Sequence, residues 1–310
     1  MNRNISNITC FLDAAGRYSH SKDLPLVVAA VGMWSSAVDE VRESLRAAMK
    51  SEPIKWSDPK QDAEHVKAVF RLIAKRQLYG VIHIIWKDTE KWDLYHKDGQ
   101  TIYDTGVKNA QQAMSYAKPM NTLKLQLFGT VMADLYGLIL HQNKYRIRQK
   151  SNSLRSVMVK LVFDSDISGE TNQKIFKDVM KGVDELPETE KATGIRATFS
   201  PSICTEQDEP LLLLADHVAG FYYSQRAYGK GLENDRKDIL HALEPLIEKW
   251  PQECFRIKEY PFEEEYLLPQ EVFDHVLPRK QREAYLSYLI GQKGIKTSSK
   301  PGRKLPRPQW

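Results

Sequence analysis

Three aspartates stand where apolar segments of the sequence end or are interrupted. Asp13 and Asp164 end apolar runs at residues 10–12 and 157–163, whereas Asp216 interrupts a leucine-rich stretch. A carboxylate delivered by a buried element is costly unless a cation meets it. Three such carboxylates are the ligand set that a two-metal site for phosphoryl chemistry requires. The chemistry that these residues could perform is therefore metal-dependent hydrolysis of a phosphodiester, with Asp13 bridging two ions and the other two aspartates completing their shells.

Each of these aspartates also has a structural interpretation. Aspartate favours turns, so Asp13 and Asp164 could simply form turns. The residues three and four positions away from Asp216 on either side are apolar or small, which predicts that it points toward the core, where it could also cap a loop or pair with an arginine. Asp166 lies two residues beyond Asp164 and would share its side if the strand continued, although a serine and a glycine soon follow. It is the fourth candidate metal ligand.

Basic side chains supply a candidate surface for nucleic acid. Lys144, Arg146 and Arg148 alternate with an aromatic and an apolar residue, so a strand here would present a cationic face to a phosphate backbone. The same pattern would protect an edge strand against aggregation. Lys55 could contact a phosphate or steady a carboxylate, and it could equally be a solvated lysine. The tail over 291–310 contains no acid and could hold nucleic acid or a partner loosely.

The elements that must position these residues follow a mixed α/β order. Strands are predicted over residues 8–13, 24–33, 79–86, 157–164 and 195–203, the first two as a hairpin. Helices are predicted after Ser35 or Ser36, over 62–77, 171–186 and 234–250, and from Asp208 or Glu209 through Asp216. Residues 53–57 read as a short extended segment. Almost no glycine or proline interrupts 107–143, which predicts one long buried helix or two helices broken near Pro119.

This order matches the ribonuclease H-like plan, a mixed β-sheet flanked by helices. In that plan the acids come from the central first strand, a neighbouring parallel strand and a late helix. We expect a ribonuclease H-like domain over 1–230 with a helical insertion over about 107–143. A helical C-terminal extension is expected over 231–290, followed by a basic tail over 291–310 that we predict to be disordered.

Composition limits the class of protein. A chain of 310 residues with 42% hydrophobic content can bury a full core. Its three cysteines have no paired spacing, which indicates a reducing compartment and argues against a disulfide scaffold or a zinc knuckle. No apolar run approaches the ~20 residues needed to span a bilayer, and no secretory leader is recognisable. We therefore expect a soluble, cytoplasmic protein without a membrane partner. No histidine pair has ligand spacing, and His217 is expected to face outward.

Four short motifs together resemble the bacterial domain-of-unknown-function 3800 family. The family has four short motifs that can be aligned with this sequence. The motif D-E-S-G corresponds to residues 13–16, and E-x-K-W/F-S corresponds to residues 53–57. A strand that ends in Asp corresponds to residues 162–164, and L-A-D-x-x-A-G corresponds to residues 214–220. The resemblance runs from residue 8 to about residue 223 and implies a nuclease-like, ribonuclease H-like fold. Ala14 stands where the family has glutamate, and Pro53 stands where a glutamate would precede the lysine. Glu52 lies one position away, which in an extended segment is the opposite face.

From the residues and the resemblance we expect a metal-dependent nuclease or nuclease-like protein, with a role in bacterial defence or mobile-element biology. Mg²⁺ or Mn²⁺ is the expected ion, because hard carboxylate oxygens suit both and leave bound waters free to react. Nucleic acid is the expected partner, with DNA and RNA both open, beside a homo-oligomer or a protein partner. Ala14 and Pro53 keep open the alternative of an inactive nucleic-acid-binding or scaffold subunit.

Overall fold

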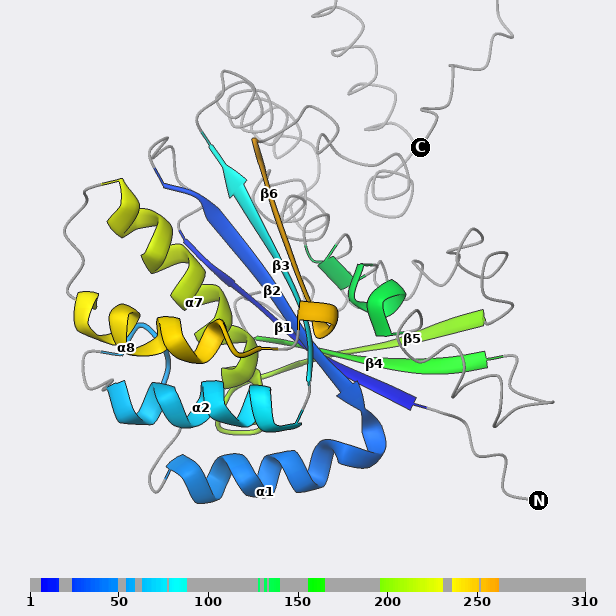
Figure 1. Ribbon diagram of the computed structural model, residues 1–310. Helices are drawn as coiled ribbons and strands as arrows, with labels where there is room; N and C mark the ends of the chain where they lie inside the picture. Colours follow the sequence, from blue (N-terminus) through cyan, green and yellow to red (C-terminus); the bar gives the residue numbers. More distant parts are fainter. Residues whose placement is uncertain are drawn as a thin grey trace, which may run out of the picture.

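A mixed sheet flanked by helices forms the centre of the molecule (Figure 1). The computed structural model describes residues 7–16, 24–49, 54–58, 63–76, 78–87, 128, 131–132, 134–139, 156–164, 196–230, 236–250 and 252–261. Its strands are β1 (Asn7–Ala15), β2 (Leu26–Trp34), β3 (Tyr79–Trp86), β4 (Ser156–Asp164), β5 (Arg196–Cys204) and β6 (Phe255–Pro261). Its α-helices with complete bounds are α1 (Val38–Met49), α2 (Ala63–Arg76), α7 (Leu212–Gly229) and α8 (Lys237–Ile247), and short 3-10 turns lie at Ser35–Ala37 and Gln252–Cys254.

The sheet has the strand order β5-β4-β1-β2-β3-β6. β2 pairs antiparallel with both β1 and β3, whereas β4 pairs parallel with β1 and β5, and β6 pairs parallel with β3. Three antiparallel strands, with two further strands added parallel to the first, are the topology of the ribonuclease H-like fold. The order and the directions confirm the fold class predicted from the sequence.

The central strands are buried on both faces of the sheet. Alternate residues of β2, including Val27, Ala29 and Val31, belong to the core beneath the helices. Gly32 faces the other side, where a Cβ atom would lie 2.9 Å from Leu135 Cδ2. The helical residues among 131–139 therefore pack directly on the second face. Because both faces are covered, β2 reads as a continuous apolar run rather than an alternating one.

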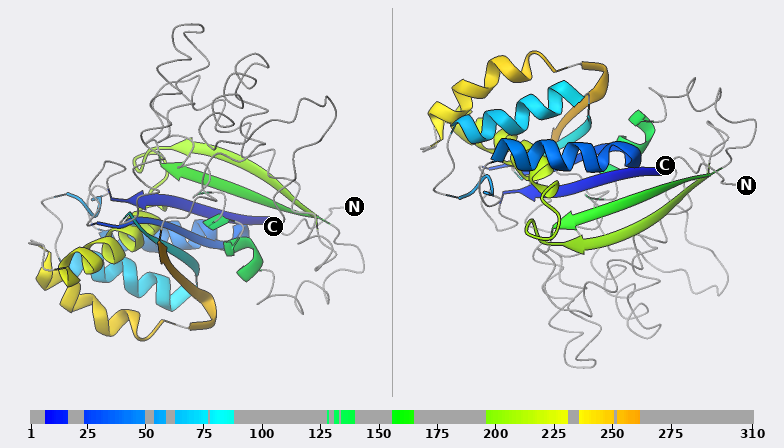
Figure 2. Two further views of the ribbon diagram at one scale, coloured as in Figure 1. Left: turned by 90° about the horizontal axis from the view of Figure 1, so that it is seen from above. Right: turned by 90° about the horizontal axis from the view of Figure 1, so that it is seen from below.

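The helices α1, α2, α7 and α8 cover one face of the sheet (Figure 2). In α1 the buried residues Val41, Leu45 and Met49 recur at helical spacing, and the charged residues lie on the opposite side of the helix. α7 is buried along most of its length and packs against β1 and β2. Within the described residues, no helix is long and apolar enough to cross a membrane.

Two predicted segments differ from the structure. Residues 231–290 were expected to be helical, but after α8 the chain forms β6, which adds a sixth strand beside β3. The signal is the alternation of Phe255 and Ile257 with basic residues, and Gly80 makes room for Phe255, whose Cε1 would lie 2.2 Å from a Cβ there. Residues 53–57 were expected to be extended. The described part of this segment is a turn, closed by the Asp58 N–H donating to the Lys55 carbonyl at 3.1 Å.

The five strands predicted over 8–13, 24–33, 79–86, 157–164 and 195–203 are confirmed as β1 to β5, with the first two in an antiparallel hairpin. The helix predicted over 62–77 is confirmed as α2. Within 107–143, the described residues 128, 131–132 and 134–139 are helical, and the rest of that segment lies outside the described residues. So do the predicted helix over 171–186 and the tail over 291–310.

Candidate functional site

Asp13 and Asp164 lie side by side at the carboxyl ends of two parallel strands. The last paired residues of β1 and β4 are Leu12 and Phe163, and each aspartate follows directly. Asp13 pairs across the hairpin with Ala29, a residue of the core beneath the helices, so its side chain points to the helical face. Asp164 shares that face, because it lies two residues beyond Val162 of the same core. Both aspartates are buried, each 6% exposed.

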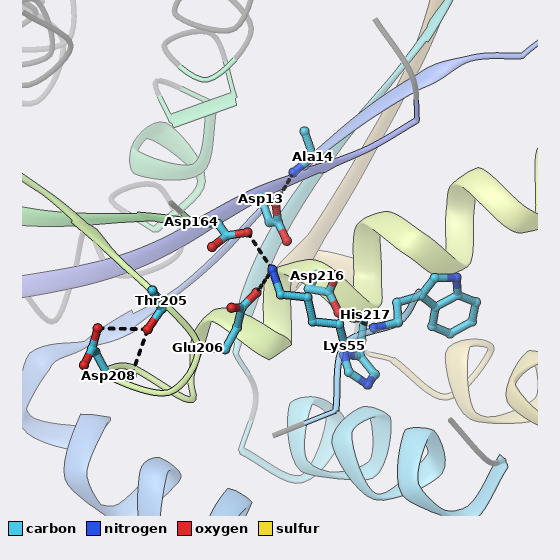
Figure 3. Close-up of polar contacts among 10 residues, drawn as sticks. Asp13, Ala14, Lys55, Asp164, Thr205, Glu206, Asp208, Asp216 and His217 are labelled. Carbon is cyan, nitrogen blue, oxygen red and sulfur yellow. Dashed lines mark hydrogen bonds and ion pairs between the residues drawn. The ribbon is translucent and has the colours of Figure 1, made fainter. Parts of the chain in front are cut away.

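Ala14 points away from this pair (Figure 3). Its N–H donates to Asp13 Oδ1 at 2.7 Å, which fixes the orientation of the carboxylate where β1 ends. Gly16 follows with φ +105°, in the left-handed region that favours glycine, and the chain turns there. A side chain at position 14 lies on the face opposite Asp13, so the departure from the family's glutamate at this position takes no carboxylate from the helical face.

The third predicted acid, Asp216, comes from α7 and holds a loop. Its Oδ2 accepts a hydrogen bond of 2.6 Å from the backbone N–H of Trp56. The indole Nε1 of Trp56 donates in turn to Ser224 Oγ, two turns along α7, at 3.1 Å. Two polar contacts thus dock the loop 54–58 on α7. They place Lys55, the residue next to Trp56, beside the aspartates at the ends of β1 and β4 (Figure 3).

Gly220 completes this docking. A Cβ atom at position 220 would lie 2.1 Å from Trp56 Cγ, so the buried indole packs against the bare backbone of α7. The close neighbour of Gly220 is thus Trp56 of the loop. The segment Leu214–Gly220 therefore forms the surface on which the loop that carries Lys55 packs.

Lys55 reaches two acidic side chains at once. Its Nζ donates to Asp164 Oδ2 at 3.0 Å and forms a second, shorter ion pair with Glu206 Oε1. The two carboxylate side chains are 5% and 4% exposed, whereas that of Lys55 is 42% exposed, so the ammonium enters a buried acidic pair from the surface. Figure 3 shows Lys55 between Asp164 and Glu206, with Asp13 and Asp216 in the same view.

Glu206 is a residue that the sequence interpretation missed. It follows β5 by two residues, and Asp164 pairs with Cys204, the last residue of that strand. A tight turn holds it: Thr205 Oγ1 bonds to Asp208 Oδ2 at 2.8 Å, and the Thr205 carbonyl accepts the N–H of Glu209 at 2.9 Å. The strand predicted over 195–203 ends three residues before Glu206, so an acidic residue near the end of a strand was the available signal.

The surroundings of Lys55 and Glu206 shift the pKa values of both groups. Burial by itself lowers the pKa of the Lys55 ammonium, but the ion pairs with Glu206 and Asp164 outweigh burial and raise that pKa above its usual value. Burial raises the pKa of Glu206; the charge of Asp164 acts in the same direction, and Lys55 opposes both. Glu206 is therefore held against a neighbouring carboxylate by the cation between them.

His217 lies inside the protein, contrary to the expectation that it faces outward. Its side chain is 0% exposed, and its Nδ1 lies 3.2 Å from Asp216 Oδ2. The ring stacks on His65 of α2 with centroids 6.2 Å apart and meets Trp56 edge-on at the same distance. α7 is buried around most of its circumference, so a position next to the inward Asp216 is covered by α2 rather than by solvent.

Four of the predicted site residues thus come together: Asp13, Lys55, Asp164 and Asp216. The structure adds Glu206 to them. The remaining predicted site residues, Asp166, Lys144, Arg146 and Arg148, lie outside the described residues.

The donor types suit a hard divalent cation, because all four acidic side chains offer carboxylate oxygen. The arrangement of these side chains does not suit such a cation. Among the described residues, no three histidine, cysteine, aspartate or glutamate side chains are placed so that they could hold an ion together. Lys55 takes the position between Asp164 and Glu206 instead. The acidic side chains fit a metal by chemistry, and their geometry as described is that of a lysine-centred ion cluster.

Comparisons with known proteins add the following. No family model matches the sequence, and the search of curated proteins finds no match either. Among solved structures, the chain is similar to a chain of the PCNA:RNase HII complex from Archaeoglobus fulgidus, at 12% identity and a TM-score of 0.33, over 96% of this chain and 98% of that one. It is also similar to ribonuclease H2 from Pyrococcus horikoshii OT3, at 14% identity and a TM-score of 0.36, over 90% and 99%. The fold assignment rests on strand order and direction.

Proposed function

We propose that this chain is a metal-dependent nuclease that hydrolyses phosphodiester bonds, and that it belongs to the domain-of-unknown-function 3800 family. One observation carries the proposal. Four separate elements deliver the carboxylates of Asp13, Asp164, Glu206 and Asp216 to the ends of the parallel strands on one face of the sheet. A fold that only needed stability would gain little from gathering buried acids, because their mutual repulsion opposes folding.

Asp13, Asp164, Glu206 and Asp216 would hold Mg²⁺ or Mn²⁺. When bound, the ion would polarise the phosphoryl oxygen and lower the pKa of a water, so that a nucleophile forms at neutral pH. The chain's own contribution is placement: Ala14 N–H orients Asp13, and the Trp56 N–H orients Asp216. Glu206 supplies a carboxylate next to Lys55 although Pro53 stands where the family has glutamate.

Nucleic acid is the proposed partner, and bacterial defence or mobile-element biology is the proposed setting. The first follows from the phosphodiester chemistry, and the basic residues Lys144, Arg146 and Arg148 would contribute to the binding surface. The second follows from the family resemblance alone.

A cleavage assay tests the enzyme proposal. Wild-type protein is incubated with single-stranded and duplex DNA, RNA and DNA–RNA hybrids in Mg²⁺ or Mn²⁺. Asp13→Asn should lower the cleavage rate by about 10²-fold or more, because the amide removes a charge that balances the ion. Asp39→Asn is the matched control, since that side chain is 89% exposed on α1 and should leave the rate unchanged. A wild-type protein that cleaves none of these substrates would rule out the nuclease.

An inactive nucleic-acid-binding or scaffold protein is the second candidate, and one observation favours it. Lys55 already occupies the position between Asp164 and Glu206, so the acidic pair has a counter-charge without any ion. If this state is permanent, the wild type should neither bind Mn²⁺ nor cleave, yet should still bind nucleic acid in a salt-dependent way. Calorimetry with Mn²⁺ alone separates the two candidates.

A further inference from the structure

The strongest unexplained feature of the site is the lysine at its centre. Lys55 Nζ lies 3.0 Å from Asp164 Oδ2 and contacts Glu206 Oε1 at the same time. A surface lysine needs no such partners, because exposed ion pairs contribute little. Here both partners are buried, and two buried carboxylates side by side are costly unless a cation stands between them. Lys55 supplies that cation.

The loop that carries Lys55 is built to bring it there. Trp56 is 5% exposed, its N–H binds Asp216, and its indole binds Ser224 and packs on Gly220. Arg236 adds two contacts: its guanidinium carbon lies 5.4 Å from the centre of the Trp56 ring, and it donates to the Asp58 carbonyl at 2.9 Å. The backbone that follows Lys55 is thus held at Trp56 and Asp58, and the four-carbon stem of the lysine is the part that can move.

We propose that Lys55 is an internal counter-cation that competes with a divalent ion for Asp164 and Glu206. The ion binds when the ammonium leaves the two carboxylates, and the ammonium returns when the ion leaves. Glu206 is the fourth carboxylate of the ion site. The inference rests on the proposed function for the kind of ion, but not on cleavage.

The exchange gives Asp164 and Glu206 a cationic partner in both states. Without the ion, the ammonium offsets the repulsion between Asp164 and Glu206. With the ion, the same two carboxylates bind a divalent charge, and Lys55 turns toward the solvent that its side chain, 42% exposed, already reaches. Competition of this kind lowers the apparent affinity of the ion by the cost of displacing the lysine.

Titration calorimetry with Mn²⁺ alone tests the exchange on the full chain. Lys55→Met should bind Mn²⁺ about tenfold more tightly than the wild type, as expected when a competitor is removed. Glu206→Gln should bind it about tenfold more weakly, because a ligand charge is lost. Lys67→Met is the control: Lys67 pairs with Glu64 at 2.7 Å on the surface of α2 and should leave the affinity unchanged. Equal affinities for wild type and Lys55→Met, or no binding by either, would overturn the proposal.

Lys55→Met removes a cation from a buried acidic pair and could prevent folding, so a second measurement uses the wild-type protein. The ¹⁵Nζ and ¹³Cε signals of its lysines are followed by NMR while Mg²⁺ is added, and Lys55→Arg identifies the signal of Lys55. Displacement predicts that this signal moves toward that of a solvated lysine as Mg²⁺ binds. A Lys55 signal that stays unchanged while Mg²⁺ binds would contradict the proposal.

The two proposals fail in different ways. If Mn²⁺ and Lys55 exchange but no nucleic acid is cleaved, the counter-cation stands and the nuclease falls. If the protein cleaves and Lys55→Met binds Mn²⁺ no more tightly than the wild type, the nuclease stands and the counter-cation falls.

Discussion

Two clusters of charged side chains, one on each face of the sheet, are built in opposite ways. On the helical face, one ammonium, that of Lys55, serves two carboxylates, Asp164 and Glu206. On the other face, one carboxylate, Asp134, is served by two donors. His83 Nε2 lies 2.8 Å from its Oδ2, and Lys258 Nζ lies 2.5 Å from the same atom.

The pKa values of Asp134 and Glu206, one acid from each cluster, move in opposite directions. At Asp134, burial by itself raises the pKa, but the hydrogen bonds from His83 and Lys258 outweigh burial and lower it. At Glu206, burial raises the pKa and Lys55 only partly opposes it. Ion pairing alone therefore does not distinguish a structural cluster from a functional one. We expect the two clusters to differ instead in their response to a divalent cation.

The largest expected difference between the two clusters is their response to a metal ion. Mn²⁺ at a concentration 100 times its Kd should stabilise the wild type by about 2.7 kcal/mol, because the ion binds the folded state alone. Asp164→Asn should lose most of that gain, whereas Asp134→Asn should keep it. Thermal unfolding of the three proteins with and without Mn²⁺ gives the answer. Equal metal-induced shifts in the two variants would show that the acid-rich cluster has no special affinity for a cation.

The next largest effect concerns the packing of the Lys55 loop on α7. Gly220→Ala places a methyl group 2.1 Å from Trp56 Cγ, so the ring or the helix must shift, and overpacking of this kind costs about 1–3 kcal/mol of unfolding free energy. Gly229→Ala is the matched control at the end of the same helix, where nothing lies within 4 Å of the added atom. Chemical denaturation measures both. If the two variants have the same free energy of unfolding, Trp56 does not depend on Gly220 for its packing.

Most of the fold could be predicted from the sequence, because β1 to β5 show either strong apolar runs or β-branched segments between clear turns. β6 was missed, since Phe255 and Ile257 alternate with charged residues over only a short stretch. A parallel edge strand is held by a partner distant in sequence, here β3, and no local pattern reports that pairing.

The site was predicted less completely, for a geometric reason. Asp13, Asp164 and Asp216 each mark an apolar element, and that is a local signal. Glu206 and the exact partners of Lys55 depend on how a loop docks on a helix far along the chain. The sequence is compatible with Asp216 as a metal ligand, a loop cap or the partner of an arginine, and the structure shows it accepting the Trp56 N–H. Tertiary contacts of this kind decide which group a carboxylate binds. Local sequence patterns predict only the helix or strand that carries the carboxylate.

The smallest predicted effect is the pH dependence of the donor-rich cluster. Because the folded state lowers the pKa of Asp134 below its usual value of 3.8, the ionised form contributes stability that is present above that value and is lost as the pH falls through the folded pKa. Asp134→Asn should cost about 1–2 kcal/mol at neutral pH, through weaker bonds to His83 and Lys258. The cost should shrink on acidification between about pH 5 and pH 2, where wild type loses the same contribution. Chemical denaturation across this range, with Asp39→Asn as the exposed control, measures the difference between the curves. Curves that stay parallel would mean that Asp134 does not titrate as a paired acid, and the contrast between the two faces would then rest on the Lys55 cluster alone.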